Sequence, residues 1–158
     1  MPGRIVDMNE ATVTTPTDRE VVITRTFNAP RAVVFEAWTK PEHVKHWWDP
    51  SGTPLERCEI DLRVGGEFQF VNREHGQMFG GIYREITPPE RLTFTTHVPT
   101  LRGEVTGKLV FRERERKTTV VLTMECKSAA DRDALLAMRV DAGTVRTLEN
   151  LAAYVEQR

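Results

Sequence analysis

Hydrophobic and polar residues alternate along most of this chain, and a period of two predicts strands rather than helices. Segments with this alternation occur at residues 20–27, 58–62, 68–70, 78–86, 92–98, 105–111 and 120–126. Turn residues such as Gly65-Gly66, Gly76 and Pro88-Pro89 separate successive segments. About seven strands joined by short turns are typical of an antiparallel sheet in which neighbours along the chain pair.

Helical spacing occurs in only two places. After the first strand, Pro30 and Pro41 suit the first turns of two short helices, which form a hairpin that ends near Trp47. Near the C-terminus, Ser128 or Asp131 can cap a helical region, with Gly143 as a candidate interruption. Its apolar stripe consists of Leu135, Met138, Val145, Leu148, Leu151, Ala152 and Val155. A meander with helices only near its start and at its end predicts the α+β class, with the last helix buried against the sheet.

The size and composition of the chain fit a single domain. It has 158 residues, of which 39% are hydrophobic and 28% charged, as is usual for a globular protein with one core. Residues 1–18 are polar and lack periodicity, so we expect a flexible N-terminal arm there, with a short edge strand as the alternative. We expect residues 19–158 to form the domain.

The charge balance argues against a nucleic-acid partner. With 22 Lys and Arg against 23 Asp and Glu, the net charge is −1, which gives no field to attract nucleic acid or an anionic membrane. We find no apolar run long enough to cross a bilayer or to act as a signal sequence, so we expect a cytoplasmic protein without a membrane partner. Cys58 and Cys126 lack neighbours at zinc spacing and are expected to be buried free thiols.

Several spaced motifs, taken in order, resemble one protein family. They are Asn28-Ala29-Pro30, Trp38-Thr39-Lys40-Pro41-Glu42 with Trp47-Trp48, Asp61-Leu62-Arg63-Val64-Gly65-Gly66, Gly80-Gly81-Ile82-Tyr83, and Ile86-Thr87-Pro88-Pro89-Glu90-Arg91-Leu92. This series resembles the START-like SRPBCC superfamily, and within it the subfamily homologous to the activator of the heat-shock-protein-90 ATPase. The resemblance implies the helix-grip fold of START-like and Bet v 1-like proteins. In that fold a curved antiparallel sheet wraps a long C-terminal helix and encloses a largely apolar pocket.

The resemblance leaves the function open. The family includes lipid carriers, hormone receptors, polyketide cyclases and chaperone activators, and a shared fold does not decide between such activities. The chain also departs from the family pattern early in the last helix. There the family commonly has Gly-Trp, whereas Gly143 is followed by Thr144. The missing indole implies a larger or a wetter pocket.

Candidate pocket residues follow from what a small-molecule site requires, namely apolar walls and a few directional polar groups. Eight residues meet this description: Trp47, Trp48, Phe68, Phe70, Tyr83, Phe94, His97 and Leu148. For most of the aromatic residues plain core packing is the favoured interpretation, and strand parity alone does not say which face lines a cavity. Tyr83 and His97 stand out, since burying their polar tips requires partners.

The sequence offers little other chemistry. Nucleophile motifs, phosphate loops and dinucleotide fingerprints are absent, so no cofactor is expected. His43 and His46 stand three apart on a predicted helix but lack a third ligand nearby, so we expect solvent-exposed histidines and no metal site. Strand residues with ionisable groups become candidates only if they face the cavity: Asp61, Arg63, Glu67 and Glu125.

Three functional hypotheses remain open. The first is non-catalytic binding of a small hydrophobic molecule between the sheet and the last helix. The second is an enzyme of the polyketide cyclase or aromatase type, which requires a cavity-facing acid–base pair such as His97 or Tyr83 with a strand carboxylate. The third is a module that activates a chaperone ATPase, suggested by the subfamily name and by the charged hairpin at residues 112–117. A homodimer is compatible with each.

Overall fold

All eight strands of the protein form one antiparallel sheet in the computed structural model, which describes residues 10–156. The order across the sheet is β1 (Thr12–Thr14), β2 (Glu20–Phe27), β8 (Lys117–Glu125), β7 (Val105–Arg114), β6 (Arg91–Thr96), β5 (Met78–Thr87), β4 (Glu67–Val71) and β3 (Arg57–Ile60). Apart from β2 and β8, strands that pair are neighbours along the chain, as the alternation predicted.

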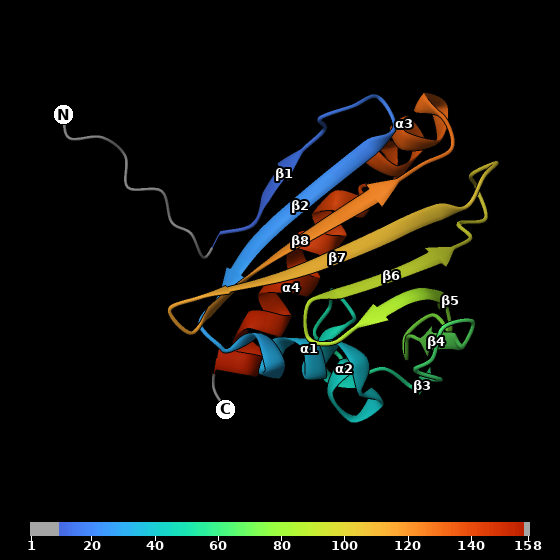
Figure 1. The fold of residues 1–158 in the computed structure, drawn as a ribbon. Coiled ribbons are helices and arrows are strands. Elements are labelled where there is room, and N and C mark those ends of the chain that lie inside the picture. The colour runs from blue at the N-terminus through green and yellow to red at the C-terminus, as the bar shows by residue number, and fades with distance from the viewer. Residues whose placement is uncertain (1–9, 157–158) are drawn as a thin grey trace.

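Four helices complete the fold over the described residues. The hairpin of α1 (Arg31–Thr39) and α2 (Pro41–Trp47) links β2 to β3, and α3 (Ala129–Ala137) and α4 (Val140–Glu156) follow β8. Figure 1 shows α4 along one face of the sheet, with α1 and α2 near one end of it. The predicted α+β helix-grip architecture is therefore confirmed.

Two details differ from the sequence prediction. An eighth strand lies within the segment expected to be an arm, because Thr12–Thr14 pair with Val22–Thr24 of β2 at the sheet edge. Residues 1–9 of that segment lie outside the described residues. The C-terminal helical region is interrupted at Arg139, whose φ of 59° ends α3, and not at Gly143, which lies inside α4.

The core lies between α4 and the β2 side of the sheet. Alternate residues of β2, among them Val21 and Ile23, point toward the helix and are almost completely buried. Leu151 and Val155 of α4 are buried as well, and α4 packs against β2, α1, α2 and α3. At about 25 cal/mol per Å² of buried apolar surface, this packing is the main contribution to stability.

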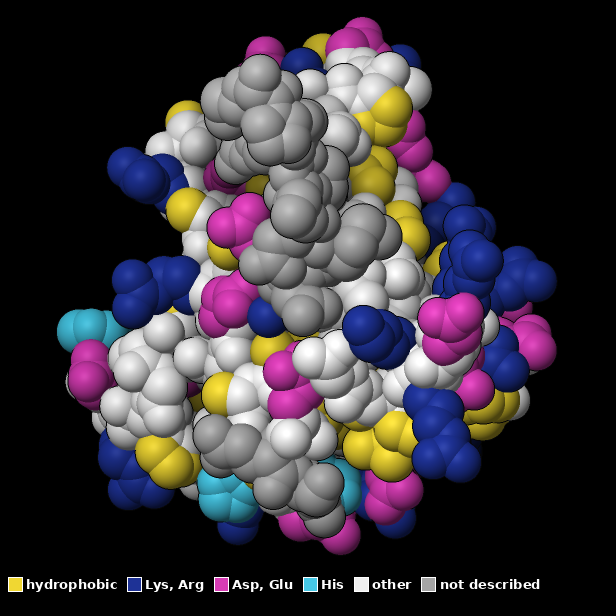
Figure 2. Space-filling model, turned by 90° about the vertical axis from the view of Figure 1, so that its left-hand side faces the viewer, with side chains coloured by type: hydrophobic (Ala, Val, Ile, Leu, Met, Phe, Trp, Pro, Cys, Tyr) yellow, Lys and Arg dark blue, Asp and Glu magenta, His cyan; other side chains and the backbone are white. Residues whose placement is uncertain are grey.

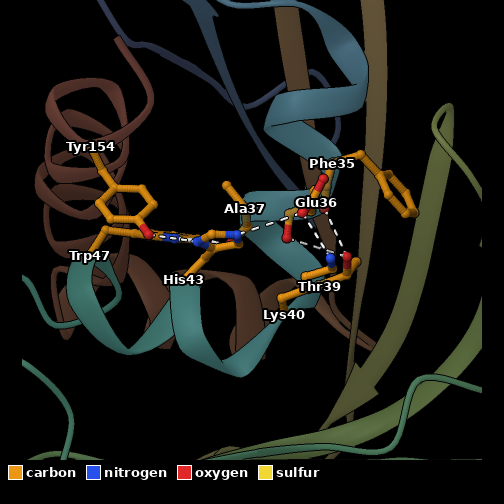
Figure 3. Close-up of polar contacts among 8 residues, drawn as sticks. All are labelled: Phe35, Glu36, Ala37, Thr39, Lys40, His43, Trp47 and Tyr154. Carbon is orange, nitrogen blue, oxygen red and sulfur yellow. Dashed lines mark hydrogen bonds and ion pairs between the residues drawn. The ribbon is translucent and has the colours of Figure 1, made fainter. Parts of the chain in front are cut away.

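The side chains of Trp47 and His43 hold the α1–α2 hairpin in place (Figure 3). Trp47 is fully buried, and its Nε1–H donates to the carbonyl oxygen of Ala37 at 3.1 Å. The Nδ1 atom of His43 lies 2.6 Å from the hydroxyl oxygen of Tyr154 on α4. The expected exposure of His43 is wrong, since only 13% of its side chain is accessible. Its partner is 111 residues away and leaves no local signal.

Two glycines allow aromatic rings to lie flat against neighbouring strands. Gly81 faces Phe68 across β5 and β4, and Gly107 faces Phe94 across β7 and β6. A Cβ atom at Gly81 would lie 2.8 Å from Cζ of Phe68, and one at Gly107 would overlap the Phe94 ring. Strands β5 and β6 pair without a register shift at Gly81, and the irregularity in their pairing lies between Tyr83 and Glu85.

A matched pair of alanine variants tests this packing. We expect Gly107→Ala to lower the free energy of unfolding by about 1–3 kcal/mol, because the new methyl group displaces the Phe94 ring. Gly143→Ala is the control, since its Cβ atom meets only Pro50 Cγ, at 3.9 Å. Helix propensity predicts that this control stabilises the protein by up to about 1 kcal/mol. Urea denaturation measures both, and equal effects would contradict the close contact.

Candidate functional site

A cavity of about 520 Å³ opens between the sheet and helices α3 and α4. Strands β4 to β8 contribute alternate residues to it, so one face of the sheet forms its wall. Aromatic residues gather on one side, from β4 to β6 and the helix hairpin: Trp38, Trp48, Phe68, Phe70, Phe79, Tyr83 and Phe94. Aliphatic residues of β7, β8, α3 and α4 form the other: Val105, Leu109, Leu122, Met124, Leu135, Val140 and Leu148.

The exposure of the lining residues locates the mouth of the cavity. Pro50, Gln77 and Met138 are exposed and come from the loop after α2, the β4–β5 hairpin and the end of α3. Tyr83 and Leu109 are almost completely buried and mark the interior. The cavity therefore opens to the surface between these loop tips and the junction of α3 and α4.

Six of the eight residues proposed from the sequence line the cavity: Trp48, Phe68, Phe70, Tyr83, Phe94 and Leu148. Trp47 is not among the lining residues, because its indole is turned into the α1–α2 contact with Ala37. His97 is exposed at the end of β6. It follows Thr96, which lines the cavity, so the strand alternation directs His97 to the other face.

No Lys, Arg, Asp, Glu or His residue within the described chain lines this cavity. The strand residues that we had considered are exposed or form ion pairs elsewhere. Arg63 Nε lies 2.8 Å from Asp61 Oδ2, and Lys108 Nζ lies 2.5 Å from Glu125 Oε2. Tyr83 is the one titratable side chain among the described lining residues. Burial raises the pKa of its phenol, and nearby Cys58 adds to this effect.

Some hydroxyl groups of the cavity lining donate a hydrogen bond within the protein, and the Tyr83 hydroxyl does not. The hydroxyl of Thr96 donates to the carbonyl oxygen of Gly80, that of Thr144 to Val140 at 2.8 Å, and that of Thr147 to Trp48 at 3.0 Å. The Tyr83 hydroxyl makes no hydrogen bond with any residue from 10 to 156. Thr144 also lines the cavity, at the position where the family commonly has a tryptophan.

Both cysteines are free thiols outside the cavity lining. Cys126 is buried and Cys58 is half-buried, and burial raises the pKa of the Cys58 thiol to about 11 despite the opposing charge of Lys45. Cys58 is therefore an unreactive thiol at neutral pH. Over the described part of the chain, no group of three His, Cys, Asp or Glu side chains is arranged to hold a metal ion.

Sequence reasoning missed several wall residues, and only some left a signal. Phe79 has the same strand parity as Tyr83, so the alternation over residues 78–86 indicates that they share a face. Leu109 and Leu122 belong to strands whose alternation was recognised. Their place in the cavity depends on which part of the sheet α4 leaves uncovered, and that is a long-range property.

The surface in Figure 2 has Lys and Arg side chains interspersed with Asp and Glu, and hydrophobic side chains in small groups between them. On the face drawn there, side chains of both charge signs lie close together. Between residues 10 and 156, no helix combines the length and the apolarity needed to span a bilayer.

Comparisons with known proteins agree with this architecture. A solved structure of a Rhodobacter sphaeroides protein shares the fold with a TM-score of 0.83 and 21% sequence identity, covering 94% of this chain and 100% of that one. A Chromobacterium violaceum protein has a TM-score of 0.73 and 26% identity, covering 89% of this chain and 99% of that one. CalU16 from Micromonospora echinospora has a TM-score of 0.71 and 22% identity, covering 96% of this chain and 77% of that one. No curated protein matches significantly. The family model described as activator of Hsp90 ATPase homolog 1-like protein matches residues 28–156, and the chain belongs to this family.

Proposed function

We propose that the protein binds a small hydrophobic molecule in the cavity between the sheet and α4. The supporting observation is a largely apolar space of about 520 Å³ that the protein's own side chains leave unfilled. Small-molecule sites typically measure about 300–1,000 Å³ and have mostly apolar walls. An unfilled apolar space in a core costs stability, so its retention favours a role in binding.

The cyclase hypothesis has less support. Enolisation of a polyketide-like substrate requires a base that removes a proton from the carbon next to a carbonyl. It also requires an acid that donates to the oxygen of that carbonyl. Tyr83 supplies a phenol, but His97 is exposed, and the carboxylates of Asp61 and Glu125 are occupied by surface ion pairs. The described lining thus offers Tyr83 no partner base.

The chaperone hypothesis rests on the family description, which names an activator of the Hsp90 ATPase. The structural feature that we had associated with it is the charged β7–β8 hairpin. Its turn residues Glu115 and Arg116 are exposed and have positive φ angles of 53° and 65°. Such a turn is typical of a tight hairpin of two strands and needs no docking role to explain it.

The first test is native mass spectrometry of protein purified from a rich lysate. We expect a stoichiometric hydrophobic passenger that is released on denaturation, because the apolar cavity gains free energy when it is filled. The protein is also mixed with purified Hsp90, and ATP hydrolysis is followed. An empty protein that stays unliganded in a lipid extract, together with stimulated ATPase activity, would refute the binding proposal in favour of the chaperone one.

A second test narrows the cavity at Thr144, which lines it near the mouth. We expect Thr144→Trp to weaken binding of the neutral fluorescent probe N-phenyl-1-naphthylamine by about tenfold or more, because the indole occupies part of the volume. Arg146→Trp is the control, since Arg146 lies on the same helix but is exposed and does not line the cavity. Equal affinities in both variants would place the probe elsewhere.

A further inference from the structure

The polar and aromatic groups of the cavity define a narrower class of ligand. We infer that the cavity selects an uncharged molecule with a flat aromatic ring system and a carbonyl or ether oxygen that accepts a hydrogen bond from the Tyr83 hydroxyl. This inference rests on the proposed binding function and specifies its ligand. It follows from three independent properties of the lining: its ring packing, its lack of charge and its unused donor.

Ring packing makes one wall of the cavity aromatic. Phe68 contacts Tyr83, Phe70 and Phe94 with ring centroids 5.0, 5.2 and 5.4 Å apart. Trp48 extends this surface, stacking on Phe79 at 5.0 Å. Aromatic pairs add about 0.5–1.5 kcal/mol beyond the area that they bury. A flat aromatic ligand gains this additional attraction, whereas an aliphatic chain of equal volume does not.

The absence of charged lining residues excludes ionised ligands. A carboxylate or ammonium group inside the cavity would lose its hydration without gaining a counter-ion from the described lining. The ligand must therefore be neutral, which separates it from free fatty acids.

The Tyr83 hydroxyl is an unused donor in the interior of the cavity. No buried side-chain nitrogen or oxygen of the described residues lacks a partner, so the unpartnered Tyr83 hydroxyl must touch accessible space. The residue is only 3% exposed and lines the cavity, so that space is the cavity itself. The indole N–H groups of Trp38 and Trp48, which also line it, donate to no described residue.

The threonine hydroxyls of the lining, by contrast, are not free donors. Thr96, Thr144 and Thr147 have each directed their proton to a backbone carbonyl oxygen. Tyr83 stays protonated at neutral pH, because burial raises its pKa. The complementary ligand group is an oxygen that accepts, such as a ketone.

Four matched probes test each property of the ligand separately. The reference is 2-acetylnaphthalene. In 2-isopropenylnaphthalene a methylene group replaces the carbonyl oxygen, 2-acetyldecalin lacks the aromatic rings, and 2-naphthoate has a negative charge. Binding of each to the wild-type protein, Tyr83→Phe and Tyr154→Phe is measured by titration calorimetry. Tyr154 provides the control, because it is the chain's other tyrosine and lies outside the cavity lining.

We expect 2-acetylnaphthalene to bind the wild-type protein and Tyr154→Phe about tenfold more tightly than 2-isopropenylnaphthalene, as one hydrogen bond predicts. In Tyr83→Phe the two affinities become equal. Replacing the rings by decalin weakens binding several-fold. The charge of 2-naphthoate weakens it by about a hundredfold or more. Affinity for the reference probe stays constant between pH 6 and 8, because the lining contains no group that titrates there.

Two results would overturn the inference while leaving the proposed function intact. One is equal affinity of the ketone and the alkene for the wild-type protein with no effect of Tyr83→Phe. The other is binding of 2-naphthoate as tight as that of the ketone. If none of the four probes binds, the inference also fails. The passenger found by native mass spectrometry then decides separately whether the proposed function fails with it.

Discussion

Helix α4 is held at a fixed place on the sheet, and the cavity depends on that placement. On one side, Glu149 forms a bidentate contact with Arg25, a buried residue of β2. On the other, the side-chain amide of Asn150 donates to the carbonyl oxygen of Asp49 at 2.9 Å, just after α2. Charge-assisted bidentate contacts are strong and directional, so they fix the helix over β2 rather than over the centre of the sheet.

Among the strands, α4 packs mainly against β2, away from the aromatic strands β4 to β6. In a close-packed core this surface would be filled by side chains from a facing element. Here Phe68 and Phe94 instead lie against Gly81 and Gly107 of adjacent strands, which keeps the rings on the wall and the space beside them open. Tyr83, between these pairs, retains an unpartnered hydroxyl in an apolar surrounding. An open space whose wall carries unused hydrogen-bond donors is consistent with selective binding.

The local sequence pattern was sufficient to predict most strands and helices, but not to predict which of their residues line the cavity. Alternation located seven strands, whereas the edge strand β1 was only the alternative to a flexible arm, because three residues are too few to show a period. Six pocket residues were found from their type, while Trp47 and His97 were misplaced. The indole of Trp47 is turned toward Ala37, and His97 follows a residue that faces the cavity. The contacts of Arg25 with Glu149 and of His43 with Tyr154 join distant segments, which periodicity does not detect.

The central claim is that an apolar space remains open beside the aromatic wall. A crystal structure determined under xenon pressure tests it most directly, because xenon occupies dry apolar cavities and avoids filled or hydrated ones. The account predicts ordered xenon between Phe68, Phe94 and Leu148, with the surrounding side chains unmoved. Absence of xenon, with side chains packed across the space or ordered water within it, would contradict the account.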